Sequence, residues 1–159
     1  MNKFMQMAIR EAQRGIHAGD GGPFGAIIVK DGMVVGRGHN QVLKRQNPTL
    51  HGEVVAIGQA TRRLHTHDLS GCELSTTGEP CPMCLCACLW ANIDRVYFGC
   101  TIADNARIGF RDERFDTLMG GRQALVTPTS DTQPYLVPLD RDACLALFDE
   151  YLSLNPETY

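Results

Sequence analysis

The sequence predicts an α/β fold of three layers, in which a central mixed sheet of five strands lies between two layers of helices. Helical and strand-like hydrophobic patterns alternate along the chain. The dipeptide Asp31-Gly32 is a strong hairpin signal, which makes the first two strands antiparallel. Helical segments separate the later strands, as parallel strands require. At 159 residues, the chain is expected to form a single domain over residues 1–159.

The first part of the chain is expected to hold two helices and a hairpin. Residues 4–18 carry apolar side chains near the helical spacing, and a glycine-rich stretch then ends this helix. Residues 24–30 and 33–38 read as the two strands of the hairpin. After a polar loop, Thr49 is the expected N-cap of a helix that reaches Leu64.

The second part alternates strands and helices. Residues 72–76 and 95–100 are expected strands. Between them, Pro82 marks the first turn of a helix that is apolar through Ala91 and should therefore be buried. The remaining expected elements are a helix at 112–119, a polar loop near 127–134, a strand at 135–139 and a last helix capped by Asp140.

Composition excludes several classes of protein. Hydrophobic residues make up 43% of the chain and charged residues 21%, which is typical of globular proteins and excludes a mainly disordered one. No apolar run approaches the ~18 residues that cross a bilayer, and no signal peptide is recognised. We therefore expect a cytoplasmic protein with no membrane contact. The net charge of −3, without a dense basic run, argues against nucleic acid as a partner.

Two short segments carry the residues of a metal site. Cys81 and Cys84 are three residues apart at the start of a helix, where the dipole and the unpaired N–H groups favour thiolates. His51 is the expected third ligand. Two thiolates and one imidazole suit Zn²⁺, and three protein ligands leave one position for a water whose pKa falls from about 16 to about 7. We expect one zinc ion per chain.

Glu53 is the expected proton shuttle. It lies two residues after His51, so the two side chains can meet only if the helix begins here. The joint pattern H-x-E and P-C-x-x-C is the signature of zinc-dependent nucleobase deaminases. Two alternatives stay open: a redox pair of cysteines, or a structural zinc site that Cys88 closes. The other cysteines, with Cys88, are expected to be small buried hydrophobes: Cys72, Cys86, Cys100 and Cys144.

These residues resemble the cytidine deaminase superfamily, and within it the bacterial guanine deaminases. The resemblance runs almost end to end, through residues 21–26, Asn40, 47–49, 51–54, 79–85, 90–91, 109–110, Asp112 and Tyr159. It implies hydrolytic deamination of a small nucleobase, above all guanine to xanthine and ammonia. It also implies a homodimer in which the C-terminal segments are exchanged between subunits.

The resemblance further implies which residues bind the substrate. Asn40 would bond the purine edge, and Asp112 would bond the side that carries the amine. The backbone N–H of Gly52 would contact the base, and Phe24 would pack on the face of the ring. Tyr159 would cap the pocket of the partner subunit.

Other activities stay open from the sequence. The tRNA adenosine deaminases share the metal motif, but Arg141 is the only basic residue after Arg122, which argues against binding of an anticodon stem. Cytosine, isocytosine or ammeline could be the substrate, because such pockets differ by few residues. A zinc-stabilised binding module without catalysis is a further class, and Glu53 argues against it.

Overall fold

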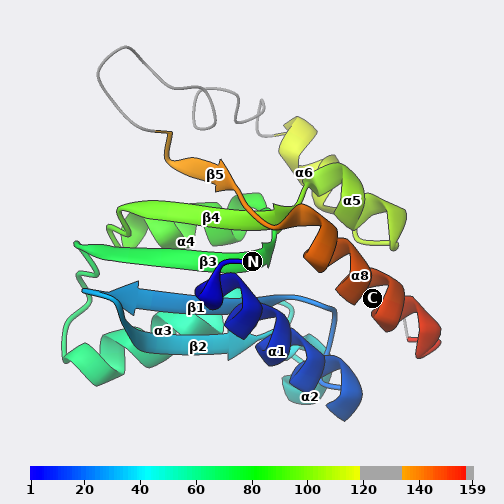
Figure 1. Cartoon of the computed structure of the whole chain (residues 1–159), viewed down its shortest axis with the longest axis horizontal. Helices are drawn as coiled ribbons and strands as arrows, with labels where there is room; N and C mark the ends of the chain where they lie inside the picture. The colour runs from blue at the N-terminus through cyan, green and yellow to red at the C-terminus, as the bar shows by residue number, and fades with distance from the viewer. Residues whose placement is uncertain (119–133, 157–159) are drawn as a thin grey trace.

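One mixed sheet organises the described part of the chain, residues 1–118 and 134–156, in the computed structural model (Figure 1). The strand order is β2-β1-β3-β4-β5. Strand β1 pairs antiparallel with β2 and with β3, whereas the β3–β4 and β4–β5 pairs are parallel. The predicted mixed, five-stranded sheet is confirmed. The strands are β1 (Gly25–Lys30), β2 (Met33–His39), β3 (Cys72–Gly78), β4 (Arg95–Cys100) and β5 (Leu136–Pro138).

Helices cover both faces of the sheet, which confirms the predicted three-layer α/β/α class (Figure 1). One layer holds α1 (Lys3–Ala18) and α8 (Arg141–Ser153), and the other holds α3 (Gly52–Leu64) and α4 (Pro82–Trp90). The shorter helices among residues 1–118 and 134–156 are α2 (Val42–Arg45), α5 (Ile102–Arg107) and α6 (Asp112–Leu118). Within the described ranges, no helix has both the length and the apolarity that crossing a membrane requires.

Strand β1 shows how the sheet joins the two helical layers. Its side chains alternate, so that Ala26 and Ile28 pack with α3 and α4, while Ile27 and Val29 pack with α1 and α8. All four are nearly or fully buried. Burial of each large aliphatic side chain contributes about 1.5–3 kcal/mol. Both layers therefore depend on the same short strand.

Glycine allows α3 to approach the sheet closely. A Cβ atom at Gly38 in β2 would lie 2.3 Å from the carbonyl oxygen of Gly52 and 2.6 Å from the backbone nitrogen of Ala56. These contacts are with backbone atoms, which cannot rotate away. The missing side chain therefore sets the height of α3 above β2, and with it the position of the helix start that carries His51 and Glu53.

The start of α3 differs from the prediction. The helix begins at Gly52 with His51 as its N-cap residue, so the prediction that Thr49 caps this helix is wrong. Asn47 is the physical reason. Its side-chain oxygen accepts hydrogen bonds from both the backbone nitrogen and the hydroxyl of Thr49, at 2.9 and 2.7 Å, which hold Thr49 in the preceding turn.

Helix α4 is buried on one face only, so the prediction that the whole helix is buried is wrong. Cys84 and Cys88 are fully buried, but Leu89 is 46% exposed and Trp90 is 86% exposed. The prediction that Cys86 is buried is also wrong, because this residue lies on the exposed face. The cysteines that are buried as predicted are Cys72, Cys88, Cys100 and Cys144.

The region after β4 contains a short helix that the sequence pattern does not predict. Helix α5 opens with a capping box, in which Thr101 and Asp104 bond each other's backbone N–H. Arg141, at the start of α8, donates hydrogen bonds of 2.7 and 2.6 Å to the Asp104 carboxylate and lowers the pKa of that carboxyl to about 2. The unpredicted helix is thereby tied to the last helix. The predicted loop near 127–134 lies almost entirely outside the described residues.

We expect Gly38→Ala to destabilise the protein by about 1–3 kcal/mol, because the added methyl group would overlap backbone atoms of α3. Gly58→Ala is the matched control within α3. A Cβ atom at Gly58 meets only the flexible side chain of Arg62, at 3.4 Å, so better helix propensity should stabilise this variant by about 0.5–1 kcal/mol. Urea unfolding of both variants measures the effect. Wild-type stability of Gly38→Ala would show that α3 can move away from the sheet without cost.

Candidate active site

The predicted site residues that the structure describes converge at one edge of the sheet. Strands β2, β3 and β4 end at this edge, and β1 begins there because it is antiparallel to β2 and β3. Phe24 precedes β1, Asn40 follows β2, and Glu79 follows β3. In α/β proteins, ligands bind beyond the carboxyl ends of the strands. The topology therefore brings distant parts of the sequence to one place.

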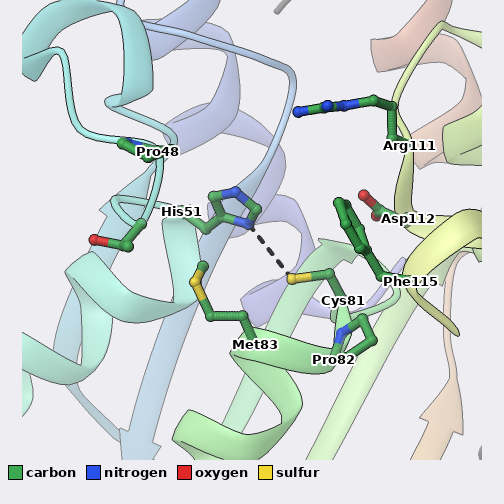
Figure 2. A pocket seen from close by; sticks show the side chains of 9 residues that line it. Pro48, His51, Cys81, Pro82, Met83, Arg111, Asp112 and Phe115 are labelled. Carbon is green, nitrogen blue, oxygen red and sulfur yellow. Dashed lines mark hydrogen bonds between the residues drawn. The ribbon is translucent and has the colours of Figure 1, made fainter. Parts of the chain in front are cut away.

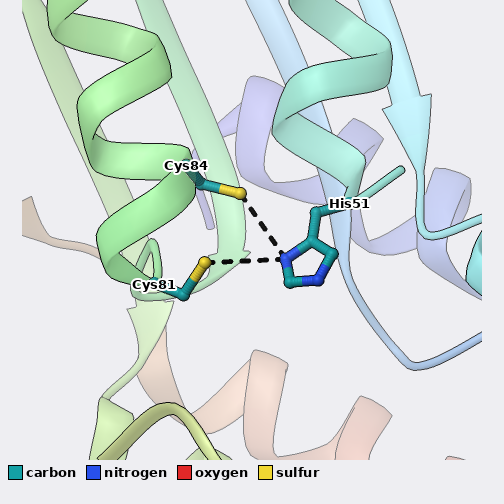
Figure 3. A group of neighbouring side chains, drawn as sticks. All are labelled: His51, Cys81 and Cys84. Atoms are coloured by element: carbon teal, nitrogen blue, oxygen red, sulfur yellow. Dashed lines mark hydrogen bonds between the residues drawn. The ribbon is translucent and has the colours of Figure 1, made fainter. Parts of the chain in front are cut away.

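Two helix N-termini meet at this edge and bring together three metal-ligand side chains. His51 is the N-cap residue of α3, Cys81 is the N-cap residue of α4, and Cys84 lies in the first turn of α4. The ligand atoms of the three residues lie within 4.8 Å of one another. The Nδ1 atom of His51 is 3.6 Å from the Cys81 sulfur and 3.5 Å from the Cys84 sulfur (Figure 3).

This donor set fits zinc. In a tetrahedral site, bonds of about 2.3 Å to sulfur and about 2.0 Å to nitrogen place those two atoms roughly 3.5 Å apart. The two sulfur–nitrogen separations in the structure agree with this value. Among the described residues, the metal-ligand group contains His51, Cys81 and Cys84. Cys88 packs in the hydrophobic core instead, so the structure does not support a zinc site that it closes.

The pKa values of the ligands show how the cluster shares its protons. A hydrogen bond from Cys84 and the contact with His51 lower the pKa of Cys81 to about 4. The same hydrogen bond and burial raise the pKa of Cys84 well above its usual value. For His51, burial lowers the pKa, but the contact with Cys81 outweighs it and the net pKa is raised. A divalent metal ion that binds here would displace these shared protons.

Glu53 is buried directly beside the ligands. It is the second residue of α3, and 5% of its surface is exposed. Burial and the charge of Cys81 raise the pKa of Glu53 to about 7. A carboxyl group of this kind can both accept and return a proton near neutral pH. The helix start at His51 thus places the ligand and the acid on the same side, as the predicted shuttle requires.

Two adjoining cavities lie beside the metal-ligand residues and Glu53. The smaller space, about 20 Å³, has room for about one water molecule and is lined by Phe24, Asn40, His51, Glu53, Glu79, Cys81, Phe110 and Asp112. The larger cavity, about 460 Å³, is within the size range of small-molecule sites. His51, Cys81 and Asp112 line both spaces. Figure 2 shows the mainly apolar walls of the larger cavity, with Pro48, Pro82, Met83, Phe115 and Arg111 around it.

Hydrogen bonds fix the two polar side chains that were predicted to bind a substrate. The Oδ1 atom of Asn40, which is 1% exposed, accepts a hydrogen bond of 3.1 Å from the backbone of Val42. The amide nitrogen Nδ2 is the donor that Asn40 could offer to a ligand. Asn105 is fully buried and donates a hydrogen bond of 2.9 Å to the Asp112 carboxylate. Asn105 has no local sequence signal, and the sequence alone does not identify it.

The remaining predicted residues differ in their placement. Phe24 lines the small space, and its ring packs edge-to-face against Phe110 at 4.8 Å and Phe148 at 5.7 Å. Gly52 is buried against the backbone of Phe24: a Cβ atom at Gly52 would lie 2.9 Å from the carbonyl oxygen of Phe24. Tyr159 lies outside the described residues.

Glu79 is a site residue to which the sequence analysis assigns no role. It lines the small space, and its carboxylate accepts a hydrogen bond of 2.9 Å from the backbone of Ile102 at the start of α5. Glu79 therefore ties the end of β3 to the segment that leads to Asp112. The sequence feature that could have identified Glu79 as a site residue is its position two residues before Cys81.

Comparison with known proteins identifies the family. Residues 1–100 match the family model of the cytidine and deoxycytidylate deaminase zinc-binding region. The chain is 45% identical over 109 residues to a guanine deaminase of Bacillus subtilis, which covers 69% of this chain and 70% of the relative. It is 46% identical over 95 residues to a tRNA-specific adenosine deaminase of Aquifex aeolicus, which covers 60% and 62%. A solved structure of guanine deaminase from Nitrosomonas europaea matches 94% of this chain and 83% of that chain, with a TM-score of 0.77 and 31% identity. The chain therefore belongs to the cytidine and deoxycytidylate deaminase family of zinc-binding proteins.

Proposed function

We propose that this protein hydrolyses the exocyclic amine of a free purine base, converting guanine and water to xanthine and ammonia. One observation carries the proposal: Glu53 and the ligands His51 and Cys81 line the same small space as two polar side chains, Asn40 and Asp112. The similarity to two guanine deaminases supports guanine as the base.

Glu53 carries out the proton transfers in the proposed reaction. When bound by His51, Cys81 and Cys84, zinc supplies the Lewis acidity that makes a water nucleophilic at neutral pH. The Glu53 carboxylate accepts a proton as the water oxygen bonds to the ring carbon that bears the amine, and it passes this proton to the adjacent ring nitrogen. It then transfers the second proton of the water to the amine. The carbon–nitrogen bond breaks, ammonia leaves, and no atom is oxidised or reduced.

The polar side chains give the proposed site its specificity. Asn40 donates from Nδ2 to an acceptor on the purine edge, and Asp112 accepts from the N–H donors on the side that carries the amine. Gly52 contacts the base through its backbone N–H, and Phe24 packs on the ring. Asn105 holds the Asp112 carboxylate in a fixed orientation. A base with the wrong edge would leave these buried groups unpaired, which costs much more than a lost apolar contact.

The exposed face of α4 supports the predicted homodimer. Trp90, Leu89 and Cys86 lie side by side on it and line a surface hollow of about 520 Å³ with His67 and Asn92. Exposed apolar side chains in one contiguous patch mark interaction sites. A second copy of the chain would cover the same patch on both subunits, as two-fold symmetry requires.

Several expectations about the whole protein stay predictions. They are the single domain over residues 1–159, the exchange of C-terminal segments, the capping of the pocket by Tyr159, and the cytoplasmic location. Seven free cysteines support a reducing compartment, because such thiols would pair in an oxidising one.

A second candidate function is deamination of adenosine in tRNA, which the similarity to the Aquifex aeolicus enzyme favours. That substrate needs several cations along the path of the nucleic-acid backbone. Arg111 is the cationic residue among those that line the larger cavity. Measurement of substrate preference separates the two functions.

We expect the wild-type enzyme to release ammonia from guanine with a higher kcat/KM than from adenine, cytosine, isocytosine, ammeline or guanosine. The reason is that guanine combines a purine acceptor edge for Asn40 with an amine beside Asp112, whereas cytosine, isocytosine and ammeline lack the second ring, adenine carries its amine on the other ring carbon, and guanosine carries a ribose. A coupled ammonia assay measures the series, with a tRNA anticodon stem-loop as the comparison substrate. Deamination of the stem-loop in the absence of activity on any free base would establish the second candidate instead.

We expect Glu53→Gln to lower kcat by about 10²–10⁴-fold, because an amide cannot accept and return a proton. Its zinc content should stay near one ion per chain, since Glu53 is not a ligand. Cys81→Ser is the contrasting variant and should lose zinc together with activity. Metal analysis and the ammonia assay on the same samples test both statements. Full activity in zinc-loaded Glu53→Gln would refute the proton shuttle.

We expect light scattering to show a wild-type dimer, and Trp90→Glu to raise the dissociation constant of this dimer by about 100-fold or more, because a charge would be buried in an apolar interface. Met33→Glu is the matched control, since Met33 is 68% exposed on the β1–β2 hairpin. A dimer of unchanged strength in Trp90→Glu would place the interface elsewhere.

A further inference from the structure

A cluster of buried charges lies behind Asn40, outside the metal site. The ring of His39, the last residue of β2, contacts Glu11 of α1 through Nδ1 at 3.0 Å and Asp20 through Nε2 at 2.8 Å. The three side chains are 11%, 9% and 8% exposed. Arg14 bonds the second oxygen of Glu11 at 3.0 Å, and Lys44 of α2 bonds Asp20 at 2.9 Å. The reaction proposed above uses none of these groups.

The geometry favours a positively charged His39. An ionised carboxylate only accepts hydrogen bonds, so a ring that contacts one carboxylate through each nitrogen must carry a proton on both. The electrostatics agree: the hydrogen bond to Glu11 raises the pKa of His39, burial opposes it, and Asp20 adds to the increase. The same contact lowers the pKa of Glu11. For Asp20, burial acts against ionisation, but the hydrogen bonds from Lys44 and His39 outweigh it and lower the pKa.

The cluster supports Asn40 from two sides. His39 precedes Asn40 in the chain, so the position of the ring anchors the backbone from which the amide projects. On the other side, the Asp20 turn packs against the amide itself: a Cβ atom at Gly21 would lie 2.1 Å from the Oδ1 atom of Asn40. The backbone oxygen of Asp20 also accepts a hydrogen bond of 3.1 Å from the backbone of Lys44, which holds α2 beside the turn. The Asn40 amide therefore sits between two segments that the His39 ring joins.

We propose that His39 is a positioning residue for substrate binding, which acts through Asn40 and does not touch the base. The His39 ring is held between Glu11 and Asp20, and it keeps the turn at Asp20 beside the end of β2. In this way it fixes the Asn40 amide that would donate to the purine edge. The inference rests on the proposed function, because it assigns to Asn40 the recognition of the substrate.

The proposal predicts a loss of affinity at alkaline pH. Deprotonation removes one of the two ring donors, which takes from one buried carboxylate its hydrogen bond to the ring and loosens the turn. Because the folded pKa of His39 lies above its ordinary value of 6.5, the stabilisation is fully present below that value and is lost as the pH rises through the folded pKa. The KM should therefore rise on the alkaline side. The change in kcat should be small, because Glu53 and the metal ligands lie on α3 and α4.

The test compares steady-state kinetics from about pH 6 to about pH 10 for the wild type and His39→Gln. We expect the variant to raise KM by about 10-fold at neutral pH, as for loss of a hydrogen bond to a charged group, with kcat changed little and the alkaline rise of KM absent. His17→Gln is the matched control. His17 also contacts a carboxylate, Glu150 at 2.7 Å, but its side chain is 57% exposed, and its loss should leave the KM profile unchanged.

Glu11→Gln provides a second test that keeps a hydrogen-bond acceptor beside the ring. Removing the charge should lower the pKa of His39 and move the alkaline rise of KM to lower pH. Wild-type KM and an unchanged alkaline limb in His39→Gln would overturn the proposal. So would a variant with lower melting temperature whose kcat falls while KM is unaffected, because that pattern reports a structural role alone.

The substrate for these measurements is whichever base of the panel the wild type deaminates. A wild type that deaminates a base other than guanine contradicts the proposed substrate, and the KM comparison on that base then tests His39 separately. A wild type that deaminates none of the bases contradicts both the proposed function and this inference.

Discussion

The convergence of two helix N-termini at one edge of the sheet is the constraint on which the rest of the structure depends. Helix α3 lies between β2 and β3 in the chain, helix α4 lies between β3 and β4, and their N-cap residues are His51 and Cys81. Unpaired N–H groups and the positive ends of both helices favour negative charge at this point, so thiolates and a buried carboxylate can coexist there. The approach is close because Gly38 presents no side chain to α3. The close packing of α3 on the sheet therefore also determines where the metal-ligand and acidic side chains lie at its edge.

The opposite wall of the site comes from the segments that follow β2 and β4. Hydrogen bonds hold one polar side chain in each segment: Asn40 is held by the backbone of α2, and Asp112 is held by Asn105. Glu79 connects the end of β3 to α5. Side chains that would recognise a base are thus fixed by hydrogen bonds before any ligand arrives, which reduces the entropy lost on binding.

Local patterns explain what could be predicted from the sequence. The five strands, the long helices and the triad of His51, Cys81 and Cys84 follow from hydrophobic periodicity and from two short motifs. The exposed face of α4 could not be predicted, because a helix that is apolar all round looks the same whether its own chain or another chain covers it. The ion cluster at His39 joins residues 28 and 19 positions away, and no local signal marks such pairs.

The placement of α1 and α8 on the same face of the sheet affects the order of assembly during synthesis. Met5 and Ala8 of α1 share a core with Leu147 and Phe148 of α8, so this core cannot close until α8 has left the ribosome. The opposite core is built mainly from α3, α4 and the first four strands, whose residues emerge much earlier, and Leu136 of β5 joins it later. A nascent chain can therefore present an assembled metal site while the other face of its sheet still waits for the last helix.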